Sequence, residues 1–150
     1  MELFIASDHA GFELKEKLKK YFDRKKIEYE DLGPKSYDKN DDYPDFIIKA
    51  AERVAETKEK GIIIGYSGEG EAIAANKVKE IRTVVYYGKN KEIIKLSREH
   101  NNANILSLGA GFLSEKEAVE AVDLWLKTPF SKEKRHIRRL KKIQDFEEKR

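Results

Sequence analysis

Residues 62–71 read Ile-Ile-Ile-Gly-Tyr-Ser-Gly-Glu-Gly-Glu, an apolar run that passes directly into a glycine-rich loop. Three consecutive isoleucines without polar alternation are typical of a strand that is buried on both faces of a sheet. The pattern from Ala72 to Lys79 then predicts a helix. A strand, a loop and a helix in this order form the repeating unit of a parallel α/β sheet.

The same alternation extends along the chain in both directions. Further strands are predicted over residues 3–6, 27–32, 83–87 and 104–108, and further helices over 12–22, 44–54, 93–99, 115–127 and about 134–149. Strands joined by right-handed helical crossovers form a parallel sheet with helices on both faces. We therefore expect one α/β domain over residues 1–150, a three-layer α/β/α Rossmann-like fold with a five-stranded parallel sheet and an appended C-terminal helix.

The last helix, about 134–149, follows Pro129 and has no later strand to pack beside. Two positions are open to it: it packs on a partner subunit, or it caps its own domain. Its first part is strongly basic, because Lys132 to Lys142 holds seven lysines and arginines against one glutamate. Such a cluster either binds phosphate or forms a solvated helix face.

Composition excludes several classes of protein. The 150 residues contain no cysteine, which rules out disulfides, thiolate metal sites and cysteine nucleophiles. The net charge of +3 comes from interspersed signs, which argues against a nucleic-acid partner. No apolar run reaches the roughly 18 residues of a membrane span, and the N-terminus begins as a strand rather than as a signal peptide. The expected location is cytoplasmic.

Three polar loops hold the residues best suited to chemistry. They are Ser7–Gly11, Gly65–Glu71 and, through a short helix, Ser97–Asn102. We expect them at the carboxyl edge of the sheet, where such folds bind ligands. The glycine-rich loop opens a helix, so its free N–H groups either hold an anion or a developing oxyanion, or simply form a tight turn. Its spacing matches neither the dinucleotide fingerprint nor a phosphate loop with Lys-Ser/Thr.

Individual side chains in these loops suggest acid–base chemistry. Glu71, at the start of the helix, is either a general base or an ordinary acidic residue of a first helical turn. His9 and His100 lie in polar settings, and a neutral imidazole transfers a proton in either direction near pH 7. Arg135 and Arg139 are one helical turn apart, so they share a face that clamps a phosphate or is merely solvated.

Together these motifs resemble the family that contains type B ribose-5-phosphate isomerase and the galactose-6-phosphate isomerase subunits. The matches occur in the family's order and span about residues 3 to 146. The matching stretches are Ser7–Gly11, Asp42–Asp45, Gly65–Lys77, Ser97–Asn104, and Arg135 and His136 with Arg139.

The resemblance implies a set of roles. The family has two versions of the base: a cysteine at the end of the third strand, where this chain has Gly65, or a glutamate after the last loop glycine, where it has Glu71. The glutamate version is therefore implied. His100 would help to open the furanose ring, and Ser67 would stabilise the enediolate with the loop backbone. The implied substrate-binding residues are Asp8, His9, Tyr43, Gly68, Gly70, Asn101, Arg135 and Arg139, with His9 and the two arginines on the phosphate.

The implied activity is interconversion of ribose 5-phosphate and ribulose 5-phosphate through an enediolate, without metal or other cofactor. The implied assembly is a homodimer or a dimer of dimers with sites shared between subunits. Neither a membrane nor a nucleic acid is expected as a partner. Two alternatives remain open: a hexose-phosphate isomerase of the galactose-6-phosphate or allose-6-phosphate type, and a non-catalytic sugar-phosphate-binding protein. One departure concerns phosphate binding, because many members carry an arginine where this chain has Gly111.

Overall fold

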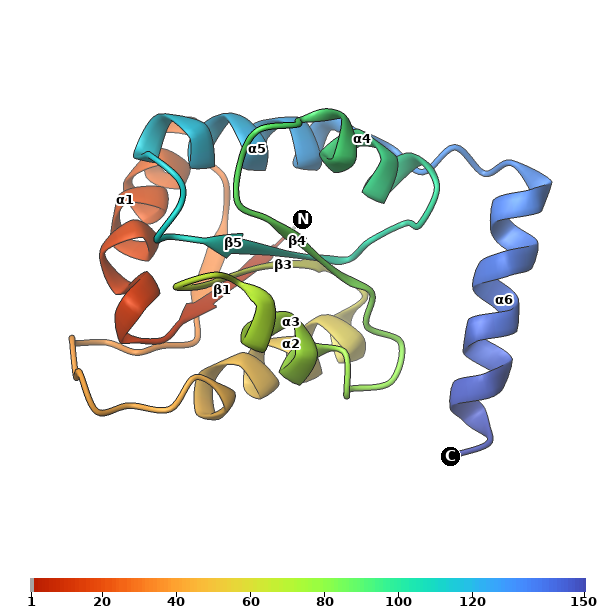
Figure 1. Ribbon diagram of the computed structural model, residues 1–150, viewed down its shortest axis with the longest axis horizontal. Helices are drawn as coiled ribbons and strands as arrows, with labels where there is room; N and C mark the ends of the chain where they lie inside the picture. Colours follow the sequence, from red (N-terminus) through yellow and green to blue (C-terminus); the bar gives the residue numbers. More distant parts are fainter. Residues whose placement is uncertain (1) are drawn as a thin grey trace.

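The computed structural model describes residues 2–150, so Met1 of the expected domain lies outside it. It confirms an α/β fold with helices on both faces of a five-stranded sheet (Figure 1). The strands are β1 (Leu3–Ser7), β2 (Tyr29–Asp31), β3 (Lys60–Gly65), β4 (Thr83–Tyr86) and β5 (Ile105–Gly109). The helices are α1 (His9–Lys25), α2 (Pro44–Thr57), α3 (Glu69–Ala75), α4 (Glu92–Glu99), α5 (Glu115–Lys127) and α6 (Lys134–Glu148).

The sheet is parallel throughout and has the order β2-β1-β3-β5-β4. The isoleucines of β3, residues 62–64, lie at its centre and are fully buried. Helices α1, α4 and α5 cover one face and α2 and α3 cover the other (Figure 1). This arrangement puts the carboxyl ends of β1, β3 and β5 side by side, with Ser7 paired to Ile64 and Gly65 to Gly109.

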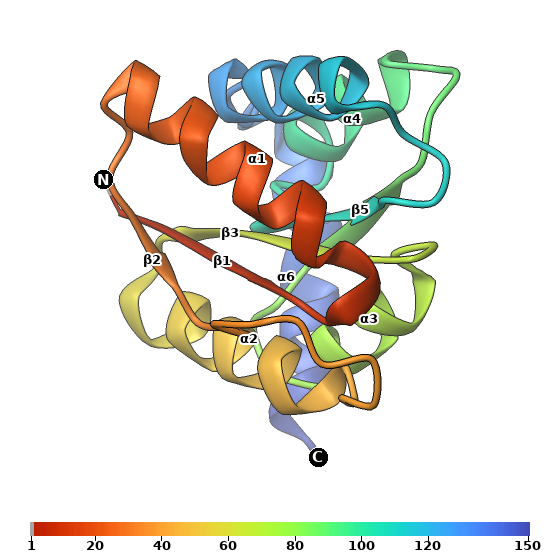
Figure 2. The ribbon, with the colours of Figure 1, turned by 90° about the vertical axis from the view of Figure 1, so that its left-hand side faces the viewer.

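Helix α6 stands apart from these layers, beyond the amino ends of the strands (Figure 1). In Figure 2, which looks onto the opposite edge, it lies behind the sheet. It touches its own domain where the backbone N–H of Glu80 donates to Glu147 at 3.1 Å. Between helix and domain is a cavity of about 500 Å³, lined by apolar residues of α6 such as Leu140 and by the start of β3. Packing of α6 on a partner subunit stays a prediction.

The bounds of several elements differ from the sequence-based expectations, and the difference at α3 bears on the site. Helix α3 begins at Glu69 rather than at Ala72 and ends at Ala75 rather than at Lys79. Gly68 precedes it with φ +85°, a left-handed turn that lets the helix start inside the glycine-rich loop. Glu71 therefore belongs to the first turn of α3.

None of the helices within residues 2–150 is both long and apolar enough to cross a membrane.

Candidate active site

The turn from β1 into α1 presents Asp8 and His9 at the carboxyl edge of the sheet. Asp8 is the N-cap of α1, and its Oδ1 accepts the backbone N–H of Gly11 at 3.1 Å. A Cβ on Gly11 would lie 2.5 Å from the carbonyl oxygen of Ile64, so the glycine allows α1 to pack directly on β3. This close approach brings Asp8 next to the loop that follows β3.

The Glu71 carboxylate fills the space at the end of β3. A Cβ added to Gly65 would lie 2.0 Å from Cδ of Glu71, so a side chain at residue 65 and the present position of Glu71 exclude each other. The physical consequence is that an acidic group on α3 reaches the point where a residue at the end of β3 would place its own side chain.

The surroundings of Glu71 favour its protonated form. Its side chain belongs to a residue only 4 % exposed. Burial raises the pKa of the Glu71 carboxyl and the negative charge of Asp8 raises it further, while the backbone amides of Glu71 and Gly68 act in the opposite direction. A carboxylate with a raised pKa is a stronger base than an exposed glutamate, which suits it to removing a proton from carbon.

The rest of the glycine-rich loop is held by its neighbours. The Ser107 hydroxyl donates to the carbonyl of Gly68 at 2.7 Å, which anchors the loop to β5. The Ser67 Oγ accepts the backbone N–H of Glu69 at 3.1 Å. A Cβ on Gly70 would lie 2.9 Å from the Tyr43 hydroxyl oxygen, so Tyr43 rests against the loop. The structure thus brings together six predicted site residues at one edge: Asp8, Tyr43, Ser67, Gly68, Gly70 and Glu71.

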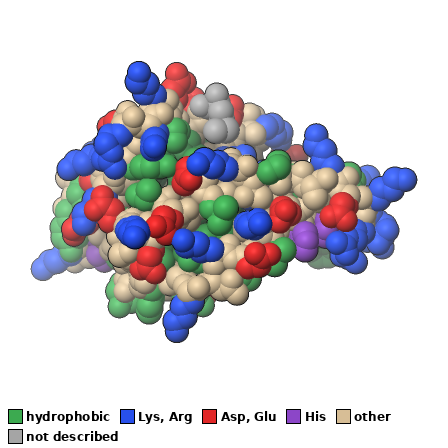
Figure 3. Space-filling model, turned by 90° about the horizontal axis from the view of Figure 1, so that it is seen from above, with side chains coloured by type: hydrophobic (Ala, Val, Ile, Leu, Met, Phe, Trp, Pro, Cys, Tyr) green, Lys and Arg blue, Asp and Glu red, His purple; other side chains and the backbone are tan. Residues whose placement is uncertain are grey.

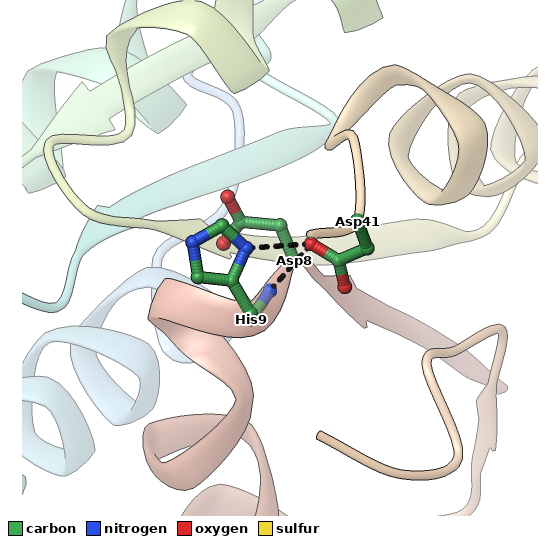
Figure 4. A group of neighbouring side chains, drawn as sticks. All are labelled: Asp8, His9 and Asp41. Carbon is green, nitrogen blue, oxygen red and sulfur yellow. Dashed lines mark hydrogen bonds and ion pairs between the residues drawn. The ribbon is translucent and has the colours of Figure 1, made fainter. Parts of the chain in front are cut away.

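His9 lies at the same edge and has a partner that the sequence analysis missed. Asp41, in the loop before α2, accepts the backbone N–H of His9 at 3.1 Å and lies 2.7 Å from its Nδ1 (Figure 4). Among the described residues, one group of three could hold a metal ion, namely Asp8, His9 and Asp41, with ligand atoms within 4.8 Å of one another. Such an ion would have to replace the hydrogen bond between Asp41 and His9.

His100 and Asn101 do not lie at this edge, contrary to the expectation for residues 97–102. Helix α4 starts after the carboxyl end of β4 and returns along the sheet, so its last turn lies at the amino edge. There the turn that follows is fixed by the buried Arg98, which donates to the carbonyls of Thr128 and Ala103 at 3.0 and 2.6 Å. The His100 ring stacks on His136 of α6 with a centroid separation of 4.2 Å.

A second polar cluster therefore forms where α4 ends and α6 begins. Arg135 and Arg139 are exposed there, on either side of the buried His136. Burial lowers the pKa of His136, and the neighbouring His100 and Arg135 lower it further. In Figure 3, histidine side chains are visible toward both ends of the long axis, and those toward one end lie among lysine and arginine side chains. Within one chain, the predicted residues fall into two groups at opposite ends of the sheet.

Comparison with known proteins identifies the family of this chain. A family model described as Ribose/Galactose Isomerase matches residues 3–143. The chain belongs to this family. It is 42% identical over 148 residues to ribose-5-phosphate isomerase B of Mycolicibacterium paratuberculosis, covering 98% of this chain and 92% of that one. It is 39% identical over 150 residues to a putative sugar phosphate isomerase of Bacillus subtilis, covering 99% of each.

Solved structures of ribose-5-phosphate isomerase B have the same fold. The Mycoplasma genitalium enzyme with bound ribulose 5-phosphate aligns with a TM-score of 0.93 at 38% identity, covering 99% of this chain and 97% of that one. The Clostridium thermocellum enzyme aligns with a TM-score of 0.93 at 40% identity, covering 99% of both chains. The family resemblance inferred from the motifs is thereby confirmed.

Gly111, where the resemblance implies an arginine in many members, lies against the ring of Tyr66. A Cβ on Gly111 would lie 2.4 Å from Cε1 of Tyr66, whose ring covers the glycine and is 62 % exposed. Phe112 packs edge-on against Tyr66 at 5.5 Å, and Tyr87 follows at 5.8 Å from Phe112. An aromatic group thus occupies the space into which a longer side chain at residue 111 would extend.

Proposed function

We propose that this protein is an aldose–ketose isomerase that interconverts ribose 5-phosphate and ribulose 5-phosphate without a metal ion. The observation that carries the proposal is the buried Glu71 carboxylate, which lies at the end of β3 where the other version of the family would place its base. Relatives about 40% identical that are named ribose-5-phosphate isomerase B support the choice of substrate. A cytoplasmic location fits this activity.

The proposed chemistry moves one proton between adjacent carbons. Glu71 removes it from C2 of the open-chain aldose and returns it to C1, while the hydroxyl proton on the C2 oxygen passes to the C1 oxygen, and the ketose results. The negative charge that develops on oxygen is stabilised by the Ser67 hydroxyl and by the loop backbone at Gly68 and Gly70. Asp8, Tyr43 and Asn101 bind sugar hydroxyls. Because donors and base are fixed in place before the substrate arrives, little reorganisation is needed at the step itself.

The active unit is proposed to be a homodimer, alone or as part of a dimer of dimers. His100, which opens the sugar ring, and the arginines of α6 lie at the opposite end of the sheet from Glu71. Two copies related by a two-fold axis place the amino edge of each against the carboxyl edge of the other, which completes two identical sites. The projecting α6, with Ile143 and Phe146 exposed, is the element that reaches the partner.

The expected result of the basic assay is isomerisation of ribose 5-phosphate by purified protein in the presence of a chelator. Five- and six-carbon aldose phosphates are compared in parallel, by formation of the ketose. Turnover that stops in chelator and returns with a divalent ion would overturn the metal-free mechanism and point to Asp8, His9 and Asp41. A preference for a six-carbon phosphate would identify a hexose-phosphate isomerase, and binding without turnover of any sugar would identify a binding protein.

Arg135→Ala and Arg139→Ala are each expected to raise KM for ribose 5-phosphate by about tenfold or more, because a charge-assisted hydrogen bond to phosphate contributes about 1.5–3 kcal/mol. The kcat value should change little, since neither side chain acts on the reacting carbons. Arg138→Ala, in the same basic helix, is the matched control and should keep the wild-type KM. Steady-state kinetics that show a wild-type KM for both variants would place the phosphate elsewhere.

A further inference from the structure

A carboxylate from the loop before α2 holds the imidazole of His9 from one side. The same oxygen, Oδ1 of Asp41, accepts the backbone N–H of His9 at 3.1 Å and lies 2.7 Å from Nδ1 of its ring. The Asp41 side chain is 8 % exposed, whereas that of His9 is 33 % exposed. One buried oxygen therefore fixes both the first residue of α1 and the orientation of its partly exposed ring.

This contact also decides which ring nitrogen is free. An acceptor at Nδ1 selects the form of the imidazole that carries its hydrogen there. The other nitrogen, Nε2, lies on the far side of the ring from Asp41 (Figure 4). Oδ2 of Asp41 is buried and has no hydrogen-bond partner among the described residues, so the negative charge of Asp41 is balanced chiefly by His9.

We propose that Asp41 is a positioning residue: it orients His9 through Nδ1 so that Nε2 binds the phosphate of the sugar phosphate. The inference rests on the proposed function, which supplies the phosphorylated substrate. It goes beyond the proposed function because it assigns a role to the loop of residues 35–43. In this role Asp41 acts through His9 and makes no contact with substrate itself. The Tyr37 ring of the same loop lies edge-on to His9 with a centroid separation of 6.2 Å.

The charged groups around His9 determine the pH dependence. The hydrogen bond to Asp41 raises the pKa of His9, burial opposes the rise, and the charges of Asp8 and Asp38 add to it. A raised pKa favours the imidazolium, which donates a charge-assisted hydrogen bond from Nε2. That contact is present at pH values below the raised pKa and is lost as the pH rises through it. Asp41→Asn keeps a hydrogen-bond acceptor but removes the negative charge, so His9 should lose its contact with phosphate at a lower pH than in the wild type.

The test first measures the tautomer and the pKa of the His9 ring and then measures enzyme turnover. In the ligand-free wild type, nitrogen-15 NMR of the histidine side chains should find neutral His9 with its hydrogen on Nδ1. In Asp41→Asn the pKa of His9 should fall. At a pH between the wild-type and variant pKa values of His9, KM for ribose 5-phosphate should rise by about tenfold, as expected when a charged donor becomes neutral. The kcat value should stay unchanged. Asp42→Asn, an exposed acid in the same loop, is the matched control and should change neither quantity.

Three outcomes would overturn the inference. The first is an unchanged pKa of His9 in Asp41→Asn, and the second is a fallen pKa with a wild-type KM at every pH. The third is a wild-type His9 whose hydrogen lies on Nε2, which decides the matter even if the variant does not fold. Titration with inorganic phosphate, followed at the His9 nitrogens, keeps the test independent of turnover. A wild-type protein that binds phosphate at His9, and binds it more weakly in Asp41→Asn, but isomerises no sugar would refute the proposed function while supporting the role of Asp41.

Discussion

Glu71→Gln is expected to lower kcat by about 100- to 10,000-fold, the usual contribution of a general base. Glutamine has nearly the same shape and fits the space beside Gly65, so the loop and α3 should survive. It cannot accept a proton from carbon, so the defining step stalls while substrate still binds. Steady-state kinetics should show the loss in kcat with KM little changed, and thermal unfolding should show a near wild-type midpoint.

The control for this variant is Glu69→Gln. Glu69 is exposed and lies two residues earlier in the same turn of α3, so its kcat should stay within about threefold of wild type, well under the general-base range. The pH profile adds a second criterion. Because burial raises the pKa of Glu71, the wild-type kcat should fall with decreasing pH sooner than for an ordinary glutamate, and this acid limb should vanish in Glu71→Gln. Reversed roles for the two glutamates would show that the base is Glu69.

A dimer of one Glu71→Gln subunit and one His100→Asn subunit is expected to recover activity that neither parent has. If each site takes Glu71 from one copy and His100 from the other, one site of the mixed dimer holds both defects and the other is intact. The purified heterodimer should then show about half of the wild-type activity, as two-fold symmetry requires. Each parent homodimer should be reduced about a hundredfold or more, in the range of acid–base catalysis.

Heterodimers are isolated after co-expression with two different affinity tags and assayed with ribose 5-phosphate. The matched control pairs Glu71→Gln with Asp8→Asn, both at the carboxyl edge. In that pair each site keeps one defect, so no recovery is expected. A Glu71→Gln and His100→Asn heterodimer that is as inactive as its parents would mean that both residues act within one subunit, and the shared site would have to be abandoned.

The fold was predictable from the sequence because its signals are local. The isoleucines of residues 62–64 identify the central strand, and the alternation around them specifies a parallel sheet with helices on both faces. The start of α3 was not predictable, because glycines at 68 and 70 favour a loop unless one takes a positive φ and the other is accepted in a helix.

The positions of some candidate site residues were predictable from the sequence, and those of others were not. Sequence reasoning placed Asp8, the glycine-rich loop and Glu71 together at the carboxyl edge, because these residues directly follow strands that end there. It misplaced His100, although a helix that returns along the sheet has to end at the opposite edge. Asp41 gave no usable signal beyond its acidity, because its hydrogen bond to His9 joins residues 32 positions apart. Contacts of that range depend on how a loop folds back, which composition and periodicity do not encode.

Because Tyr66 packs on Gly111, the effects of substitutions at these two positions depend on each other. In a scan of single substitutions, every side chain placed at residue 111 meets the Tyr66 ring that covers the backbone there, so this exposed ring has to move to make room. The same side chain no longer meets that ring when residue 66 is glycine. The effect of a substitution at residue 111 therefore depends on which residue occupies position 66, so substitutions at the two positions are expected not to be additive.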